Sequence, residues 1–119
     1  MAKPRVDSAE GHAAVAAVLA GSSERTDIAS AVRYLLQLMG DATPGHTVEL
    51  RVPPFGAIQC VEGPEHTRGT PPNVVEMDPP TWIALATGSL SWAGAYDAGK
   101  ISASGVRSDL STQLPLAQW

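Results

Sequence analysis

The segment from His66 to Asn73 holds the densest group of side chains that could do chemistry. It reads His-Thr-Arg-Gly-Thr-Pro-Pro-Asn and combines an imidazole, a guanidinium, two hydroxyls and an amide. Arg68 could pair with an anionic head group, and His66 could donate or accept a proton. The alternative is structural, because two consecutive prolines stiffen a loop whose polar side chains can satisfy its own backbone. Both interpretations stay open, and His66 and Arg68 are candidate ligand-binding residues.

The other histidines and the single cysteine lack the spacing of a catalytic or metal site. His12 and His46 are far apart in the chain, and the sequence has no Gly-rich phosphate loop and no nucleophile elbow. Cys60 shares one face of a predicted strand with Ile58, which favours a small buried hydrophobic side chain over a reactive thiol. We therefore expect no catalytic residue, no metal ion and no cofactor.

The three tryptophans are the other residues that could form a site. They make up half of the aromatic side chains, alongside two tyrosines and one phenylalanine. Trp82 and Trp92 lie in adjacent predicted helices and are expected to face the sheet. Core packing and the lining of a ligand cavity are both open for them, because pocket walls are mostly apolar and aromatic.

Composition excludes several classes of protein. A chain of 119 residues has room for one domain, and its net charge of −4 without a basic run argues against nucleic acid as the main partner. The sequence shows no apolar run near the roughly 20 residues that span a bilayer, and its first residues lack the apolar region of a signal peptide. We expect a small soluble cytoplasmic domain.

The supply of bulky apolar side chains is small. Hydrophobic residues make up 44% of the chain, but 18 of them are alanine, and Ile, Leu, Val and Phe together number only 25. Alanine buries little area, so the predicted core is thin. Such a domain is either partly hollow or completed by a ligand or a second chain.

The hydrophobic periodicity predicts helices first, then strands, then both in alternation. Residues 1–8 are polar and expected to be disordered. Helices are predicted over 10–20, over 26–40 with Thr26 as the cap and Gly40 as the stop, over 79–87 between Asp78 and Gly88, over 92–98 after Ser91, and over 109–114. Strands are predicted over 47–52, 57–61, 74–77 and 101–104. This order predicts an α+β domain whose single sheet has three strands meeting in sequence, a fourth added after the helices, and helices over one face.

The second half of the chain resembles the end of a sterol carrier protein type 2 domain. The resemblance is carried by residues 74–93, which read VVEMDPPTWIALATGSLSWA, by AGKISASG at 98–105 and by Ser-Asp-Leu at 108–110. The segments RVPPFGAIQCVEG at 51–63 and HTRGTPPN at 66–73 are similar to the stand-alone branch of this family found in actinobacteria. The resemblance covers about residues 26–116. It implies a five-stranded mixed sheet, of which the sequence shows four strands, and an apolar tunnel for fatty acyl chains or sterols.

Three hypotheses about function follow from this resemblance and the thin core. The leading one is a non-enzymatic carrier for a fatty acid or a sterol-like lipid, with a cavity walled by Trp82, Leu85, Trp92 and Ile101, and with Arg68 at its rim. Uptake would then require movement of the last predicted helix. The second is a self-associating interaction domain, a homodimer without a ligand of its own. The third is an accessory domain that completes an active site in trans through His66 and Arg68.

Overall fold

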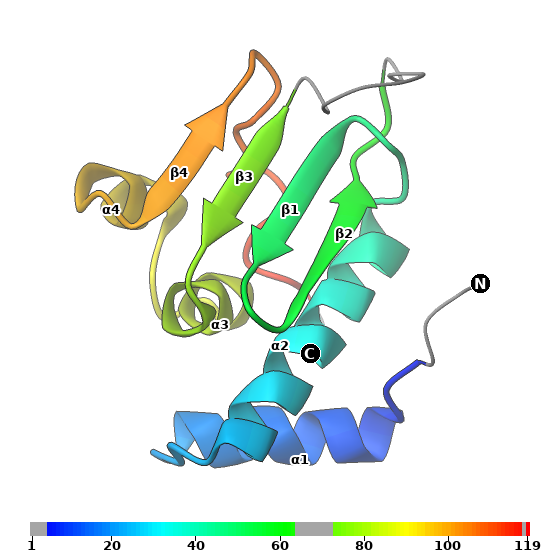
Figure 1. The fold of residues 1–119 in the computed structure, drawn as a ribbon, viewed down its shortest axis with the longest axis vertical. Helices are drawn as coiled ribbons and strands as arrows, with labels where there is room; N and C mark the ends of the chain where they lie inside the picture. Colours follow the sequence, from blue (N-terminus) through cyan, green and yellow to red (C-terminus); the bar gives the residue numbers. More distant parts are fainter. Residues whose placement is uncertain (1–4, 64–72, 118) are drawn as a thin grey trace.

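The computed structural model describes residues 5–63, 73–117 and 119. Within them, two helices precede a pair of strands, and a third strand, two shorter helices and a last strand follow (Figure 1). The elements are α1 (Ser8–Leu19), α2 (Arg25–Ala42), β1 (Val48–Val52), β2 (Gly56–Cys60), β3 (Val74–Met77), α3 (Pro79–Thr87), α4 (Trp92–Asp97) and β4 (Ile101–Ser104). The predicted α+β class is confirmed. No helix of the described residues is long and apolar enough to cross a membrane.

The strands form one mixed sheet in the order β2-β1-β3-β4. β1 is antiparallel to β2, as predicted, and β3 is antiparallel to β4. The third strand does not extend the β1–β2 hairpin beyond β2; it lies beside β1 and is parallel to it. β2 and β4 are therefore the two edges among the described strands, and the segment that could hold a fifth strand, residues 64–72, lies outside the described residues.

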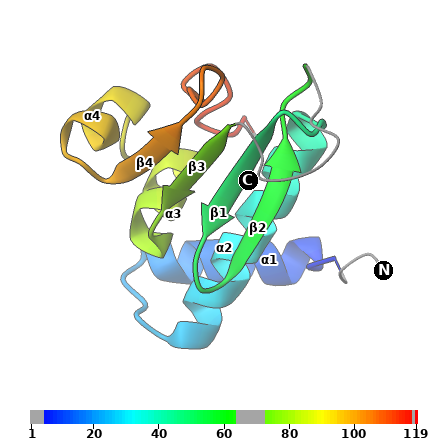
Figure 2. The same cartoon turned by 45° about the horizontal axis from the view of Figure 1, so that its top comes forward.

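The helices cover one face of this sheet, as predicted. In both ribbon views α2, α3 and the C-terminal segment lie behind the strands (Figures 1 and 2). The inward-facing residues of β1, Val48, Leu50 and Val52, are completely buried, while Glu49 and Arg51 alternate with them on the open face. Period-two alternation thus marks which face of the strand packs against the helices.

Two predicted ends of α2 are wrong. Glu24 rather than Thr26 occupies the N-cap position, and its side chain makes no capping hydrogen bond. The helix continues through Gly40 to Ala42, and the Thr43 amide then donates to the carbonyl of Met39. Glycine ends a helix when it adopts a left-handed conformation, but Gly40 stays helical. Two distant residues bond the chain just after it, Arg5 to the Asp41 carboxylate and the Val61 amide to the Thr43 carbonyl at 2.8 Å.

The predicted boundaries of α3 and the predicted start of α4 are confirmed, and α4 ends at Asp97, one residue before its predicted end. The Asp78 carboxylate accepts a hydrogen bond of 2.9 Å from the Thr81 amide, and the Ser91 hydroxyl accepts one of 3.0 Å from the Gly94 amide. Gly88 closes α3 with a φ of 88°, a left-handed conformation that favours glycine. These short helices begin and end where local side-chain chemistry places them.

The predicted helix over 109–114 is wrong, because the chain forms a turn and an extended segment there. The Asp109 carboxylate accepts a hydrogen bond from the Ser111 amide, two residues on, and the Gln113 amide donates to the Leu110 carbonyl. These contacts close a tight turn rather than start a helix, and Pro115 lacks the amide that a helix would need. We call residues 105–117 the C-terminal segment.

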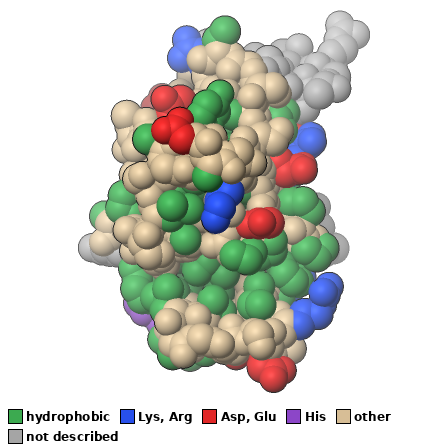
Figure 3. Space-filling model, turned by 90° about the vertical axis from the view of Figure 1, so that its left-hand side faces the viewer, with side chains coloured by type: hydrophobic (Ala, Val, Ile, Leu, Met, Phe, Trp, Pro, Cys, Tyr) green, Lys and Arg blue, Asp and Glu red, His purple; other side chains and the backbone are tan. Residues whose placement is uncertain are grey.

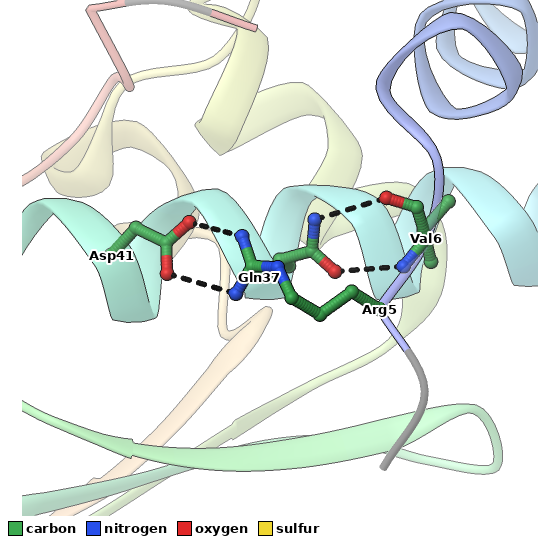
Figure 4. Close-up of polar contacts among 4 residues, drawn as sticks. All are labelled: Arg5, Val6, Gln37 and Asp41. Carbon is green, nitrogen blue, oxygen red and sulfur yellow. Dashed lines mark hydrogen bonds and ion pairs between the residues drawn. The ribbon is translucent and has the colours of Figure 1, made fainter. Parts of the chain in front are cut away.

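The N-terminal residues within the described part pack along α2. The Arg5 guanidinium bonds the Asp41 carboxylate at 2.6 and 3.3 Å, and the Gln37 side chain exchanges hydrogen bonds of 2.8 and 3.1 Å with the backbone of Val6 (Figure 4). Residues 5–8, expected to be disordered with the rest of 1–8, thus have defined contacts; residues 1–4 lie outside the described residues. We call residues 5–7 the N-terminal strap.

α1 packs closely against α2 at a glycine. A Cβ atom on Gly11 would lie 2.2 Å from the Tyr34 ring, so only glycine permits this approach. The His12 ring lies 5.5 Å from the Tyr34 ring centroid and stacks on Trp119 at 6.0 Å. Trp119 at the other end of the described chain therefore packs against α1.

Candidate ligand-binding site

The corner between α3 and α4 forms a cavity with the C-terminal segment. Gly88 turns the chain out of α3, and Pro115 packs 3.5 Å from the position that a Cβ atom on Gly88 would take. The cavity between these parts has a volume of about 240 Å³. Its lining is mostly apolar and consists of Leu85, Leu90, Ser91, Trp92, Ala93, Ser111, Leu114 and Pro115.

A second, more open hollow adjoins this cavity on the other side of Trp92. It measures about 340 Å³ and lies between α4, β4 and the start of the C-terminal segment, and Trp92 belongs to the walls of both. Its other lining residues are Tyr96, Ala103, Gly105, Val106, Ser108 and Asp109. The half-buried Trp92 therefore lines two half-open hollows, one mostly apolar and one mostly polar.

Two large apolar side chains are exposed at this hollow, although its lining is otherwise mostly polar. Tyr96 is 55% exposed and Val106 is 99% exposed. Figure 3 shows the side of the molecule on which α4 and β4 lie, and hydrophobic side chains gather mainly in its lower half, below these two elements. Apolar groups gathered on a surface in this way mark a place for a ligand or a partner.

The C-terminal segment covers the cavity and is anchored at three points. The Arg107 amide donates to the side chain of buried Asn73 at 2.9 Å, and the Leu116 amide donates to the Ala86 carbonyl at 2.9 Å. Between them, Leu110 is completely buried in the core. The part between Ser111 and Pro115, which lines the cavity, is therefore the span between two buried leucines.

The structure brings together two of the residues predicted for the site. Leu85 and Trp92 line the same cavity. Trp82 instead lies in the core with no exposed surface, and its indole N–H donates to the Val32 carbonyl at 3.3 Å. Ile101 pairs with Met77 in the sheet and is only 8% exposed. Neither Trp82 nor Ile101 lines the cavity.

His66 and Arg68, predicted at the rim, lie outside the described residues. Three further residues line the cavity together with Leu85 and Trp92 and were not predicted from the sequence: Leu90, Ser111 and Leu114. The Leu114-Pro115 pair carried a signal, since a proline there argues against a helix and for a segment that crosses a surface. Its place against α3 depends on long-range packing and has no local signature.

Two groups that could take part in chemistry, Asp109 and Cys60, are held in the fold. Hydrogen bonds from the side chain and backbone of Ser111 lower the pKa of Asp109, which lies at the edge of the outer hollow. The Asp109 carboxylate therefore stays ionised at neutral pH and is already hydrogen-bonded within the chain. Cys60, the single thiol, is buried in β2, and burial raises its pKa to about 11, as a structural cysteine requires. Within the described residues, no group of three or more His, Cys, Asp or Glu side chains could hold a metal ion.

Comparison with known families gives one match. The model of a family described as bacterial SCP ortholog, where SCP abbreviates sterol carrier protein, matches residues 24–116. The match begins at the N-cap of α2 and ends at Leu116, so it includes the whole sheet and the cavity but neither α1 nor Trp119. No curated protein matches the chain.

Proposed function

The chain belongs to the bacterial SCP ortholog family, and from this premise we propose that it is a non-enzymatic carrier or binding domain for an apolar small molecule. The observation that carries the proposal is the apolar cavity between α3, α4 and the C-terminal segment. Its lining offers Leu85, Leu90 and Leu114 for contact and contains no ionisable side chain. The ligand class is a fatty acyl chain or a sterol-like lipid.

Burial of the ligand would supply the binding energy. Each methylene group removed from water contributes about 0.8 kcal/mol, so even a part of an acyl chain binds usefully. The cavity of about 240 Å³ is smaller than the roughly 300 Å³ at which pockets begin to hold drug-sized ligands. A whole lipid therefore needs the adjoining hollow beyond Trp92, or displacement of the Ser111–Pro115 span.

The span can move without unfolding the sheet. The hydrogen bond from Leu116 to Ala86 and the burial of Leu110 fix its two ends, while Ser111 and Pro115 are exposed. Segments with few buried contacts open at low free energy, which suits them as lids over binding sites. During ligand uptake this span would swing outward while Leu110 and Leu116 stay buried.

A filled cavity tests this proposal. Native mass spectrometry of gently purified protein, and titration with oleic acid and with its uncharged analogue oleyl alcohol, should show one bound lipid per chain. Ser111→Trp fills the cavity and should abolish uptake of both probes. Ser102→Trp, on the exposed face of β4, is the matched control and should bind like the natural protein. Absence of co-purified lipid together with no uptake of either probe would overturn the proposal.

A second candidate function is self-association without a ligand, and one observation favours it. Tyr96 and Val106 present apolar surface to solvent beside Trp92, as an interface between two copies would. A homodimer through this face should dissociate when Val106 is replaced by Asp, as light scattering over a range of concentrations would show. A natural protein that stays monomeric at high concentration eliminates this candidate.

A further inference from the structure

A separate cavity lies at the opposite edge of the sheet, under the N-terminal strap. It is formed by the strap, α2 and the edge strand β2 and has a volume of about 240 Å³. Its lining residues are Arg5, Val6, Arg33, Leu36, Gln37, Phe55, Gly56, Ala57 and Ile58, none of which lines the cavity at α3 and α4. β2 and β4 are opposite edges in Figure 1, so the two cavities are independent sites.

The floor of this cavity is apolar, and a glycine keeps it open. Leu36, Phe55 and Ile58 contribute side chains to the lining. A Cβ atom on Gly56 would lie 3.1 Å from the Leu36 Cδ1 atom, so any larger residue at this position would extend into the same space. The cavity can therefore take a short apolar group.

Its rim carries positive charge that is held in position. The Arg33 Nε donates to the Phe55 carbonyl at 3.0 Å, which fixes the plane of the guanidinium. Within the described part of the chain this is the only hydrogen bond of the Arg33 side chain, so its two terminal nitrogens have no hydrogen-bond partner there, and Arg33 lines the cavity. Arg25 lies over the Phe55 ring at 4.9 Å and adds a further positive charge to the same turn.

Arg5 is the second guanidinium of the lining, and it has an internal partner. Its terminal nitrogens bond both oxygens of Asp41 on the surface of the last turn of α2 (Figure 4). The strap does not depend on this ion pair alone, because Gln37 holds the Val6 backbone through two hydrogen bonds. Arg5 can therefore exchange Asp41 for an external anion while the strap stays in place.

The concentration of charge contrasts with the chain as a whole. The net charge is −4, yet three of its eight Lys and Arg residues, Arg5, Arg25 and Arg33, gather around this cavity. Guanidinium groups bind carboxylate and phosphate in a bidentate geometry that a lysine cannot reproduce. Charged rim and apolar floor together match a molecule with an anionic head and a short apolar chain.

We propose that this cavity binds a small amphiphilic anion, a carboxylate or a phosphate ester. Arg33 holds the head group, Arg5 leaves Asp41 to join it, and the chain lies against Leu36, Phe55 and Ile58. Arg5 and Val6 precede residue 24, where the family match begins, so the site includes a part of this chain that the family model does not cover. It is additional to the lipid cavity proposed above and does not depend on it.

Calorimetric titration of the full chain carrying Ser111→Trp, which fills the lipid cavity, with octanoate, octyl phosphate and uncharged octanol tests the charge requirement. Octanoate or octyl phosphate should bind, and octanol should bind at least about tenfold more weakly. Whichever anion binds more tightly identifies the head group as carboxylate or phosphate. Octanol binding as tightly as both anions would overturn the proposal.

Three variants locate the site. Arg33→Gln should weaken anion binding by about tenfold, while Arg107→Gln, the same charge change at an exposed position near β4, should leave it unchanged. Asp41→Asn should tighten binding several-fold because it frees Arg5, an outcome that general destabilisation cannot produce. Equal weakening by Arg33→Gln and Arg107→Gln, or weakening by Asp41→Asn with the fold intact by circular dichroism, would refute the site. Because Ser111→Trp leaves this cavity untouched, failure here and failure of the carrier function remain distinguishable.

Discussion

The two cavities have nearly the same volume, but different forces close them. The N-terminal strap lies over its cavity through polar contacts, an exposed ion pair between Arg5 and Asp41 and two partly buried hydrogen bonds exchanged between the Gln37 side chain and the Val6 backbone. The C-terminal segment lies over the other through buried Leu110 and Leu116. Exposed ion pairs contribute little to stability, whereas buried leucines contribute several kcal/mol. Salt or a ligand can therefore replace the ion pair that helps to hold the N-terminal strap. The C-terminal segment, in contrast, can move only between its two buried leucines.

The strongest test of this difference is removal of a C-terminal anchor. Leu110→Ala deletes a completely buried side chain and should lower the free energy of unfolding by about 2–5 kcal/mol, as urea denaturation would measure. The matched change on the other cover, Val6→Ala, removes a half-buried side chain and should cost less than about 1.5 kcal/mol. Equal losses would mean that the two covers are anchored alike.

The reactivity of Cys60, which is buried in β2, measures how often this edge strand opens to solvent. Burial raises the Cys60 pKa from 9.0 to about 11, so at pH 8 the native thiolate fraction should be about a hundredfold below that of the unfolded chain. Reaction with a thiol reagent should be slower by at least that factor until urea unfolds the protein. Rapid modification of the native protein would show that β2 opens as readily as the Ser111–Pro115 span of the C-terminal segment.

The same thiol gives a sign for the pH dependence. As pH rises from about 9 towards 11, the unfolded thiol ionises while the native one stays protonated, so the unfolded state releases the proton and stability falls. Cys60→Ala should remove this alkaline loss while lowering stability at pH 7 through the lost packing. Persistence of the full alkaline loss in that variant would assign it to other groups.

Replacement by alanine at two glycines, Gly88 after α3 and Gly40 within α2, should change the free energy of unfolding in opposite directions. Gly88→Ala places a side chain at a φ of 88° beside Pro115 and should destabilise by about 1–2 kcal/mol. Gly40→Ala lies within α2, where the nearest atom is 3.8 Å from the new methyl group, and should stabilise by about 0.5–1 kcal/mol. Thermal denaturation compares the two directly; a loss of stability at Gly40 would show that the end of α2 needs glycine.

The limits of prediction from sequence follow the same division between local and long-range contacts. Elements with their own capping chemistry, Asp78 and Gly88 around α3 and Ser91 before α4, begin and end as predicted at these residues because the partners lie within four residues. The end of α2 was mispredicted because it is set by distant contacts. The last helix was mispredicted because Asp109 bonds Ser111 instead of capping. The family resemblance over about 26–116 is confirmed by the match over 24–116.

The sites show this limit most clearly. Leu85 and Trp92 could be chosen from helical spacing, and both line a cavity, but spacing alone could not distinguish them from Trp82, which the Val32 carbonyl holds in the core. Arg5 and Asp41 are 36 residues apart, and no pattern relates them. Helix faces are periodic in sequence, whereas the cover that lies over a face is a property of the folded chain.

The smallest expected effect comes from two exposed carboxylates, Asp41, which bonds the N-terminal strap, and Asp109, which belongs to the C-terminal segment. The hydrogen bond and charge of Arg5 lower the pKa of Asp41, and Ser111 lowers that of Asp109. A lowered carboxyl pKa stabilises the native state at neutral pH, and this contribution disappears as pH falls from about 4 through the native value. Asp41→Asn and Asp109→Asn should each reduce the fall in the free energy of unfolding below about pH 4. The effect should be small because both carboxyl groups are exposed.

Salt should separate the two carboxylates. The Asp41 contribution depends on a full charge 36 residues away and should shrink at about 1 M salt, where the screening length falls to roughly 3 Å. The Asp109 contribution is a hydrogen bond within two residues, so it should persist in salt, and because part of it survives in the unfolded chain it should also be the smaller. Differential acid titration of the two variants at low and high salt measures both effects. Equal salt sensitivity would mean that the strap is not held by an exchangeable ion pair, and the route by which Arg5 reaches an external anion would be lost with it.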